Sequence, residues 1–228
     1  MRWADLRKGG TDFVLARDLD EPDRQFLEVE DVKMNPSLAL VVIFVSLILM
    51  GGGTADDAAP AEILDLAAQT SERWVEKGEE YLSMGMYNES IASFDKALEV
   101  DPENAIALNG KGFTLLSLGQ YNESISHFDR AIEIDPENDV AWNNKGFALM
   151  SLERYDESLQ CFNRSLEIDP EDAFTWNNKG SALLSLERYE ESLDCFEESI
   201  MINSFYVNPW ILRNQADLAL KEKKKESC

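Results

Sequence analysis

The sequence predicts an all-α protein built as a solenoid of antiparallel helical hairpins. A 34-residue period supports this prediction, because residues 151–155 recur as 185–189 and residues 142–146 recur as 176–180. Sequence periods of roughly 20 to 50 residues are typical of proteins that stack one small supersecondary unit on the next. Within each unit, apolar residues recur every three or four positions, which is the spacing of one helical face. We therefore expect each unit to form two amphipathic helices.

The period divides the repeat region into four units. These are residues 71–104, 105–138, 139–172 and 173–206. In the first unit, the predicted core stripe of the second helix consists of Ile91, Phe94, Ala97 and Leu98. Near the ends of three units stand Pro102, Pro136 and Pro170. Proline cannot continue a helix, so each of them should turn the chain into the next unit.

Four sets of residues share an offset within the units: a large first-helix residue, a glycine, a tyrosine at the start of the second helix, and a second-helix phenylalanine. The sets are Trp74, Leu108, Trp142 and Trp176; Gly78, Gly112, Gly146 and Gly180; Tyr87, Tyr121, Tyr155 and Tyr189; and Phe94, Phe128, Phe162 and Phe196. In this pattern the chain resembles the tetratricopeptide-repeat (TPR) family. The resemblance implies a right-handed α-solenoid, with these aromatic residues used for packing.

The repeats depart from the family pattern at one offset of the second helix, where the family usually has alanine. This chain has Ser90, Ser124, Ser158 and Ser192 there. A serine hydroxyl in a helix can bond to the carbonyl one turn earlier. We expect that bond at each site, with a small loss of stability and no change of fold.

Residues 207–228 follow the fourth unit and should form a capping helix with a lysine-rich tail. Asn203 and Ser204 replace the Asp-Pro pair, and Trp210 stands where a fifth unit would have its tryptophan. Solenoids need a terminal element that covers the last apolar face. Lysines near the end of a helix also suit the negative end of its dipole.

The resemblance implies that first helices line a concave face on which a partner peptide lies, extended or helical. The candidate site residues are Asn109, Phe113, Asn143, Asn144, Phe147, Asn177, Asn178 and Ser181. Asparagine carries both donors and an acceptor, so it can bond a peptide backbone without reading side chains. Phe113 and Phe147 would supply apolar anchors. The alternative is that the asparagines only reflect duplication of a solvated helix surface.

One branch of the family holds the C-terminal carboxylate of chaperone tails with several Lys or Arg residues on this face. Lys111, Lys145 and Lys179 stand at a neighbouring offset. We expect their stems to pack and their ammonium groups to reach solvent. Chaperone-tail binding is therefore the weaker reading of this surface.

The composition argues against several other functions. The formal net charge of -23 would repel a phosphate backbone, so nucleic acid is not expected as a partner. The chain has no phosphate-binding glycine loop, no nucleophile elbow and a single histidine, so we predict no enzyme and no cofactor. His127, Cys161 and Cys195 share one offset, but equivalent helices should lie about 8–10 Å apart, which is too far for one metal or a disulfide.

The N-terminal third should contain a membrane-directed segment. Residues 1–33 are expected to be poorly ordered, 34–55 to form a signal anchor or signal peptide, and 56–70 a linker with a helical lead-in. The apolar run starts at Leu38 and ends at Met50, a length between a signal peptide and a spanning helix. Basic residues precede it, which predicts an anchor with the repeats outside the cytoplasm. Cleavage after Ala55, if Met34 is the start, would instead secrete the repeats.

These observations predict a non-catalytic, membrane-tethered scaffold for protein–protein interaction. Two alternatives stay open: a self-associating structural scaffold, which would be a homo-oligomer, and a regulatory subunit of a separate enzyme. Three glycosylation patterns, at Asn88, Asn122 and Asn163, would matter only outside the cytoplasm.

Overall fold

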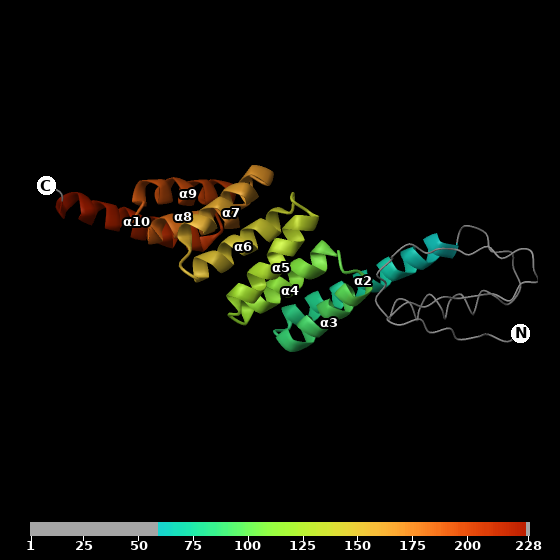
Figure 1. The fold of residues 1–228 in the computed structure, drawn as a ribbon. Helices are drawn as coiled ribbons and strands as arrows, with labels where there is room; N and C mark the ends of the chain where they lie inside the picture. Colours follow the sequence, from blue (N-terminus) through green and yellow to red (C-terminus); the bar gives the residue numbers. More distant parts are fainter. Residues whose placement is uncertain (1–58, 227–228) are drawn as a thin grey trace, which may run out of the picture.

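The computed structural model describes residues 59–226, which fold into the helices α2 to α10 without a strand (Figure 1). The helices are α2 (Ala59–Ser83), α3 (Tyr87–Val100), α4 (Ala105–Ser117), α5 (Tyr121–Ile134), α6 (Asp139–Ser151), α7 (Tyr155–Ile168), α8 (Ala173–Ser185), α9 (Tyr189–Ile202) and α10 (Val207–Glu226). The prediction of an all-α protein is therefore confirmed.

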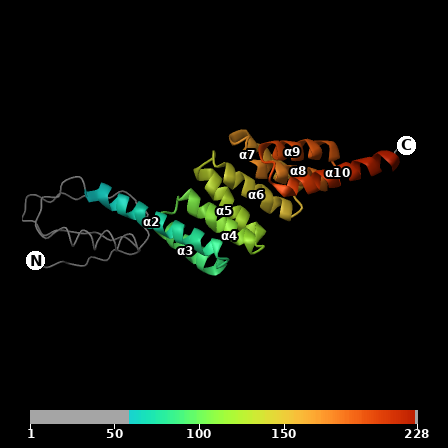
Figure 2. The same cartoon turned by 180° about the vertical axis from the view of Figure 1, so that it is seen from behind.

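Successive helices form hairpins that stack in one direction. The hairpins are α2–α3, α4–α5, α6–α7 and α8–α9, and each second helix also packs against the first helix of the next hairpin. The two opposite views show the stack running from α2 to α10 (Figures 1 and 2). Helix α10 closes it by packing against α9 and α8.

Neighbouring hairpins pack more closely on the side formed by the first helices than on the side formed by the second helices. Helices α2, α4, α6, α8 and α10 contact their neighbours in this series directly, whereas successive second helices make at most marginal contact within residues 59–226. A stack that is tighter on one side curves toward that side. The first helices therefore line the inner side of the solenoid, as the family resemblance implies.

Four phenylalanine rings occupy the centres of the hairpins. Phe94, Phe128, Phe162 and Phe196 are fully buried. Each ring presses against the glycine of its own first helix: a Cβ on Gly146 would lie 2.6 Å from Cε1 of Phe162, and one on Gly180 would lie 2.7 Å from Cε1 of Phe196. No side chain fits at that distance, so these glycines permit the close approach of the two helices.

The turn inside each hairpin needs one residue in the left-handed region. Gly85 and Gly119 supply it in the first two hairpins with φ of 73° and 76°. Glu153 and Glu187 supply it in the last two with φ of 61° and 57°. Glycine adopts this conformation without steric cost, whereas glutamate does so at a cost of roughly 1 kcal/mol. The last two hairpins therefore keep the turn geometry at some expense of stability.

Side-chain caps begin the first helices after each inter-unit turn. Asn104 and Asn138 accept hydrogen bonds from the backbone N–H of Ala107 and Ala141, both at 2.9 Å. Asp172 accepts from the N–H of Phe174 at 2.9 Å in the same way. Such caps satisfy donors that have no partner within the helix.

The serine prediction is wrong at three of its four sites, since only Ser158 makes the expected bond. Ser90 and Ser192 donate their hydroxyl hydrogens to the carbonyl oxygens of Gly78 and Gly180, each at 2.9 Å, across the hairpin. Ser158 bonds one turn earlier in its own helix, at 2.7 Å from the Tyr155 carbonyl. The Oγ of Ser124 is buried and has no partner among the described residues. The glycine brings the first-helix backbone within reach of the hydroxyl, so the cross-hairpin bond competes with the local one.

Helix α10 differs from the other first helices on the side where a second helix would pack. It carries Asn214 at the glycine offset and Asp217 where α4, α6 and α8 have a buried leucine. Ion pairs hold it against the α8–α9 hairpin: Arg213 with Glu197 of α9 at 2.7 Å, and Lys223 with Glu187 of the turn before α9 at 3.1 Å. Trp210 stays partly exposed.

The predicted segments 1–33 and 34–55, with the apolar run from Leu38 to Met50, lie outside the described residues. Helix α2 starts at Ala59 and continues without a break through most of the predicted lead-in into the first unit. Within residues 59–226, none of the helices combines the length and apolar composition that crossing a membrane requires.

Candidate peptide-binding surface

Four residues of each first helix lie at the offsets on the inner side of the solenoid, and we call this set the first-helix face. Its members are Glu72, Val75, Glu76 and Glu79 on α2; Ile106, Asn109, Gly110 and Phe113 on α4; Val140, Asn143, Asn144 and Phe147 on α6; and Phe174, Asn177, Asn178 and Ser181 on α8. Val75, Asn144 and Asn177 are its buried members. Within each helix these residues follow one another at spacings of three, one and three positions, so they share one side of the helix.

The predicted asparagines bond to one another across neighbouring first helices, and we call this series the amide ladder. Asn144 Nδ2 donates to Asn109 Oδ1 at 3.1 Å. The next unit repeats the bond, from Asn178 Nδ2 to Asn143 Oδ1 at 3.1 Å. Asn208 of α10 ends the ladder by donating to Asn177 Oδ1 at 3.2 Å. The asparagines therefore link the units and are not merely a solvated helix surface.

The amide ladder leaves part of its hydrogen-bonding capacity unused. A carboxamide has two N–H donors and an oxygen with two lone pairs. Within the described residues, Nδ2 of Asn109 and Asn143 donates no hydrogen bond, and Oδ1 of Asn144 and Asn178 accepts none. Among the described residues, the face thus has a free donor group on each of α4, α6 and α8, and a free acceptor group on α6 and α8 only, because α4 has Gly110 at that offset.

Apolar side chains flank the amide ladder on one side. The predicted anchors Phe113 and Phe147 are 39% and 38% exposed, which is high for phenylalanine in a packed array. The equivalent residue of the fourth unit is Ser181, whose hydroxyl donates to the Asn177 carbonyl at 2.8 Å. This flank is therefore apolar on α4 and α6 and polar on α8.

A second apolar row flanks the ladder on the other side and was not among the predicted residues. Ile106, Val140 and Phe174 are 60%, 49% and 56% exposed. The signal was present, because the second residue of three successive units is apolar. The row was missed because each of its residues is next in sequence to a core residue, such as the buried Ala107 and Ala141, so an apolar residue there looks like part of the core.

Helix α2 breaks the pattern of the other first helices. It carries Glu72, Glu76 and Glu79, all exposed, at the offsets that are apolar or amide-bearing on α6. The ladder cannot extend to α2 because α4 has Gly110 at the required offset. A Cβ there would lie 2.6 Å from Cε1 of Phe94, so only glycine fits. The first-helix face thus has an acidic end on α2 and an apolar, amide-bearing remainder.

The repeated lysines point toward the second helices. Lys111 pairs with Asp95 of α3 at 2.7 Å, and Lys145 pairs with Asp129 of α5 at 2.6 Å. The Lys179 ammonium lies 5.0 Å from the centre of the Trp176 ring, close enough for a cation–π interaction. The stems pack as expected, but the ammonium groups bind neighbouring groups instead of reaching solvent. They are therefore not arranged to hold a carboxylate on the first-helix face.

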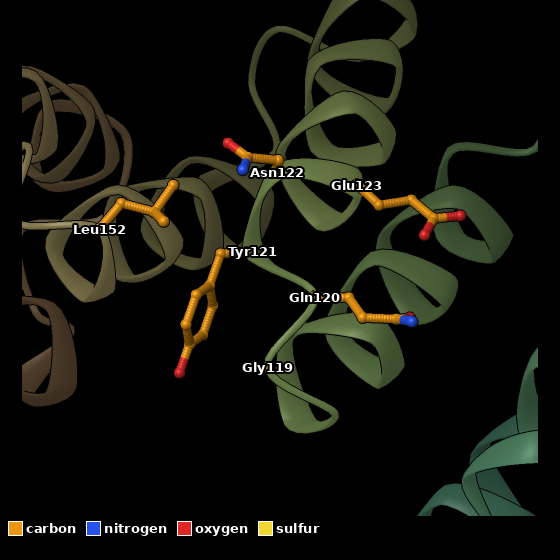
Figure 3. A pocket seen from close by; sticks show the side chains of 6 residues that line it. All are labelled: Gly119, Gln120, Tyr121, Asn122, Glu123 and Leu152. Carbon is orange, nitrogen blue, oxygen red and sulfur yellow. The ribbon is translucent and has the colours of Figure 1, made fainter.

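Two hollows in the described part of the chain lie away from this face. One of about 690 Å³ opens between α5 and α7 over α6, and its lining includes the paired groups Lys145 and Asp129. The other, of about 310 Å³, lies at the turn between α4 and α5 and is lined by Gly119, Tyr121 and Leu152 among others (Figure 3). Charges at the larger hollow are paired with each other, so neither hollow offers a distinctive ligand site.

The three residues considered for a metal or disulfide lie on successive second helices, where Cys161 and Cys195 are buried and His127 is half-buried. Cys161 and Cys195 are free thiols, and burial raises the pKa of each to about 11. Burial, assisted by Lys111, lowers the pKa of the His127 imidazole below 6.5. Among the residues that the structure describes, no three His, Cys, Asp or Glu side chains are grouped to hold a metal ion.

Stacked hairpins with a repeated inner surface define the class of helical repeat proteins. Tetratricopeptide-repeat models match residues 75–139, 140–172 and 173–206, which together make up more than half of the chain. The chain belongs to the tetratricopeptide-repeat family. Proteins of this family generally mediate protein–protein interactions, and their fold is typically a non-catalytic scaffold.

Solved structures share the fold at low sequence identity. PilF of Pseudomonas aeruginosa matches with a TM-score of 0.63 and 23% identity over 69% of this chain and 71% of that one. YrrB, described as a TPR protein with an unusual peptide-binding site, matches with 0.56 and 22% over 78% and 84%. The first TPR domain of RPAP3, bound to the HSP90 peptide SRMEEVD, matches with 0.51 and 23% over 52% and 94%. No curated protein sequence matches. The predicted right-handed α-solenoid is confirmed.

Proposed function

We propose that this chain is a membrane-tethered, non-catalytic scaffold that binds a polypeptide segment along the first-helix face. The observation that carries the proposal is the amide ladder, with its free donor and acceptor groups, between two exposed apolar rows. An extended peptide presents one N–H and one C=O per residue, and both need partners when water is displaced. The ladder offers such partners at regular intervals along the inner side of the solenoid.

The apolar rows would supply most of the affinity for the bound peptide, and the amide ladder would align its backbone. Phe113 and Phe147 lie on one side of the ladder, and Ile106 and Val140 lie on the other. Successive side chains of an extended peptide point to opposite sides, so both rows can contact one bound strand. Binding energy at interfaces is concentrated in a few such apolar anchors.

Two structural neighbours are described with a bound peptide or a peptide-binding site of their own, which supports the proposal. RPAP3 is described with an HSP90 peptide that ends in an aspartate, and YrrB with an unusual peptide-binding site. In this chain Lys111 and Lys145 are occupied by Asp95 and Asp129. The positions of these lysines therefore favour backbone recognition over a carboxylate clamp.

The membrane tether is proposed from the sequence alone. The run from Leu38 to Met50 is apolar except for Ser46, and basic residues precede it but do not follow it closely. This pattern favours an anchor that leaves the repeats outside the cytoplasm, or secretion if the chain is cleaved near Ala55. Protease digestion of intact cells tests the proposal, because protection of the repeats from added protease would reverse the orientation.

Self-association by end-to-end stacking is less favoured. A further second helix on α10 would bring its aromatic side chain against Asn214 instead of glycine and against Asp217 instead of leucine. Sedimentation of the full chain in detergent tests this point, and a concentration-dependent oligomer would favour a structural scaffold. Within residues 59–226, no feature favours the alternative that the chain is a regulatory subunit of a separate enzyme.

Proximity labelling from the full chain in cells tests the binding surface. The test variant is Phe113→Ser with Phe147→Ser, because these exposed side chains can change without emptying the core. The matched control is Met84→Ser with Ile134→Ser, two exposed apolar residues away from the face. We expect the test variant to lose specific labelled proteins that the control keeps. An unchanged labelled set in the test variant would contradict the proposed surface.

A further inference from the structure

The acidic end of the first-helix face on α2 is chemically distinct from the rest. Glu72, Glu76 and Glu79 are exposed, and within residues 59–226 none of them forms an ion pair. They are spaced four and three residues apart, so three like charges repel one another along one side of the helix. Lys77, on the same helix, turns to the Trp74 and Tyr81 rings, 5.2 and 5.6 Å from their centres.

Some carboxylates elsewhere in the described residues have a counter-charge, whereas others, such as Glu89, Glu133 and Glu198, form no ion pair. Glu157, Glu191 and Glu197 each pair with an arginine at 2.6 to 2.7 Å. On α2, three unpaired carboxylates lie together on the surface that continues into the apolar rows of α4 and α6, and neither Arg73 nor Lys77 of this helix forms an ion pair with them. A cation placed there from outside would relieve their repulsion and gain three ionic contacts.

We infer that the first-helix face takes an extended peptide with Lys or Arg residues at one end, seated on α2, and apolar side chains along α4 to α8. The inference rests on the proposed function and adds the chemistry and placement of the partner. The formal net charge of -23 also draws cationic partners toward the chain. An acidic peptide would meet repulsion both from α2 and from the chain as a whole.

The geometry sets the length of the bound segment. Neighbouring packed helices lie about 8–10 Å apart, so the four first helices α2 to α8 cover about 24–30 Å. An extended chain rises about 3.3 Å per residue, so this distance corresponds to roughly seven to nine residues. About three of them would lie over α2, and the rest over the apolar rows.

Fluorescence polarisation with the full chain in detergent micelles tests the inference. The probes are ten-residue peptides of alternating Leu and Ser with three Lys residues at one end, made in both directions, and the same peptides with Gln in place of Lys. The test variant is Glu72→Gln, Glu76→Gln and Glu79→Gln together. The control is Glu89→Gln, Glu133→Gln and Glu198→Gln, which makes the same charge change on second helices.

For the better direction, we expect the Lys peptide to bind roughly tenfold more tightly than its Gln counterpart, as three exposed ion pairs allow. The test variant should lose this difference and the control should keep it. If Lys and Gln peptides bind equally, or the preference survives in the test variant, the inference is overturned. A peptide signal that falls as protein concentration rises would assign the face to a second copy and overturn it as well.

The Phe113→Ser, Phe147→Ser variant separates this outcome from failure of the proposed function. If both peptides bind equally and this variant abolishes both, peptide binding on the face stands and only the charge preference is wrong. If no peptide binds, or binding ignores this variant, the proposed function itself fails.

Discussion

The Ser192 hydroxyl donates a hydrogen bond to the Gly180 carbonyl oxygen at 2.9 Å, whereas the equivalent hydroxyl of Ser124 is buried without a partner. The same substitution should therefore have opposite effects at the two sites. Ser192→Ala removes a buried hydrogen bond and should lower the free energy of unfolding by about 1 kcal/mol. Ser124→Ala removes an unsatisfied buried hydroxyl and should raise it by about 1 kcal/mol. Thermal unfolding followed by circular dichroism measures both, and shifts of the same sign would contradict the assignment.

The amide ladder should contribute to stability in the absence of any partner. Asn144→Ala leaves Asn109 Oδ1 without its donor, so we expect a loss of about 1 kcal/mol. A double-mutant cycle with Asn109→Ala should give a coupling energy of about 0.5–1.5 kcal/mol, because the two side chains bond to each other. Urea unfolding of the two single variants and the double variant provides the numbers. Additive losses would show that the bond does not form in solution.

The left-handed turn residues offer a stabilising change. Glu153 has φ of 61°, and within the described residues its side chain forms no hydrogen bond or ion pair. Glu153→Gly should raise the free energy of unfolding by about 0.5–1 kcal/mol by removing a steric conflict. The converse control is Gly119→Ala, at φ of 76°, which should lose about 1 kcal/mol. Thermal melts test the pair, and a destabilised Glu153→Gly variant would refute the argument.

Acid should destabilise the chain partly through His127. Burial lowers the pKa of its imidazole below the ordinary 6.5, so the unfolded chain binds the proton more readily than the folded one. The stability that His127 gives is complete above pH 6.5 and is lost as pH falls through the folded-state pKa. The variant His127→Cys carries at this offset the residue that the next two units have. Its free energy of unfolding should differ less between pH 7.5 and pH 5.5 than that of the unmodified protein. Equal pH dependence in both proteins would rule out a contribution from His127.

The buried thiols should resist alkylation in the folded protein. Burial raises the pKa of Cys161 and Cys195 from 9.0 to about 11, which lowers the thiolate fraction at neutral pH roughly a hundredfold. In a Cys228→Ser variant at pH 7.5, iodoacetamide should label both thiols of the protein unfolded in urea. Over the same time it should label neither thiol of the folded protein. Mass spectrometry after timed quenching measures the rates, and labelling in the native protein as fast as in urea would contradict this burial.

The sequence was most informative where one offset has the same role in every unit. Each second helix begins at the tyrosine that the motif indicated, from Tyr87 to Tyr189. The phenylalanine and glycine offsets form the predicted hairpin cores, because the contact between them lies within one unit and repeats with it. Local periodicity and a fixed packing partner are enough to predict such features.

Interactions between units were harder to predict. The bond from Asn144 to Asn109 joins residues 35 positions apart, and a 34-residue period gives no indication that adjacent offsets of neighbouring helices meet. The partner of each serine also depends on how closely the backbone of the first helix approaches. The exposed row at Ile106, Val140 and Phe174 was visible in the sequence, but only the structure distinguishes it from the buried residues beside it.

The amide ladder also has a mechanical consequence, because it joins the first helices only along the inner edge of the stack. Straightening the solenoid would lengthen the hydrogen bonds between Asn109 and Asn144 and between Asn143 and Asn178. Tighter curvature would not bring the second helices, which have few contacts with one another, closer together. The curvature of the free solenoid is therefore set by a few hydrogen bonds along its inner edge. Small-angle scattering of the Asn109→Ala, Asn143→Ala variant should show a longer, straighter particle, and an unchanged profile would argue against this role.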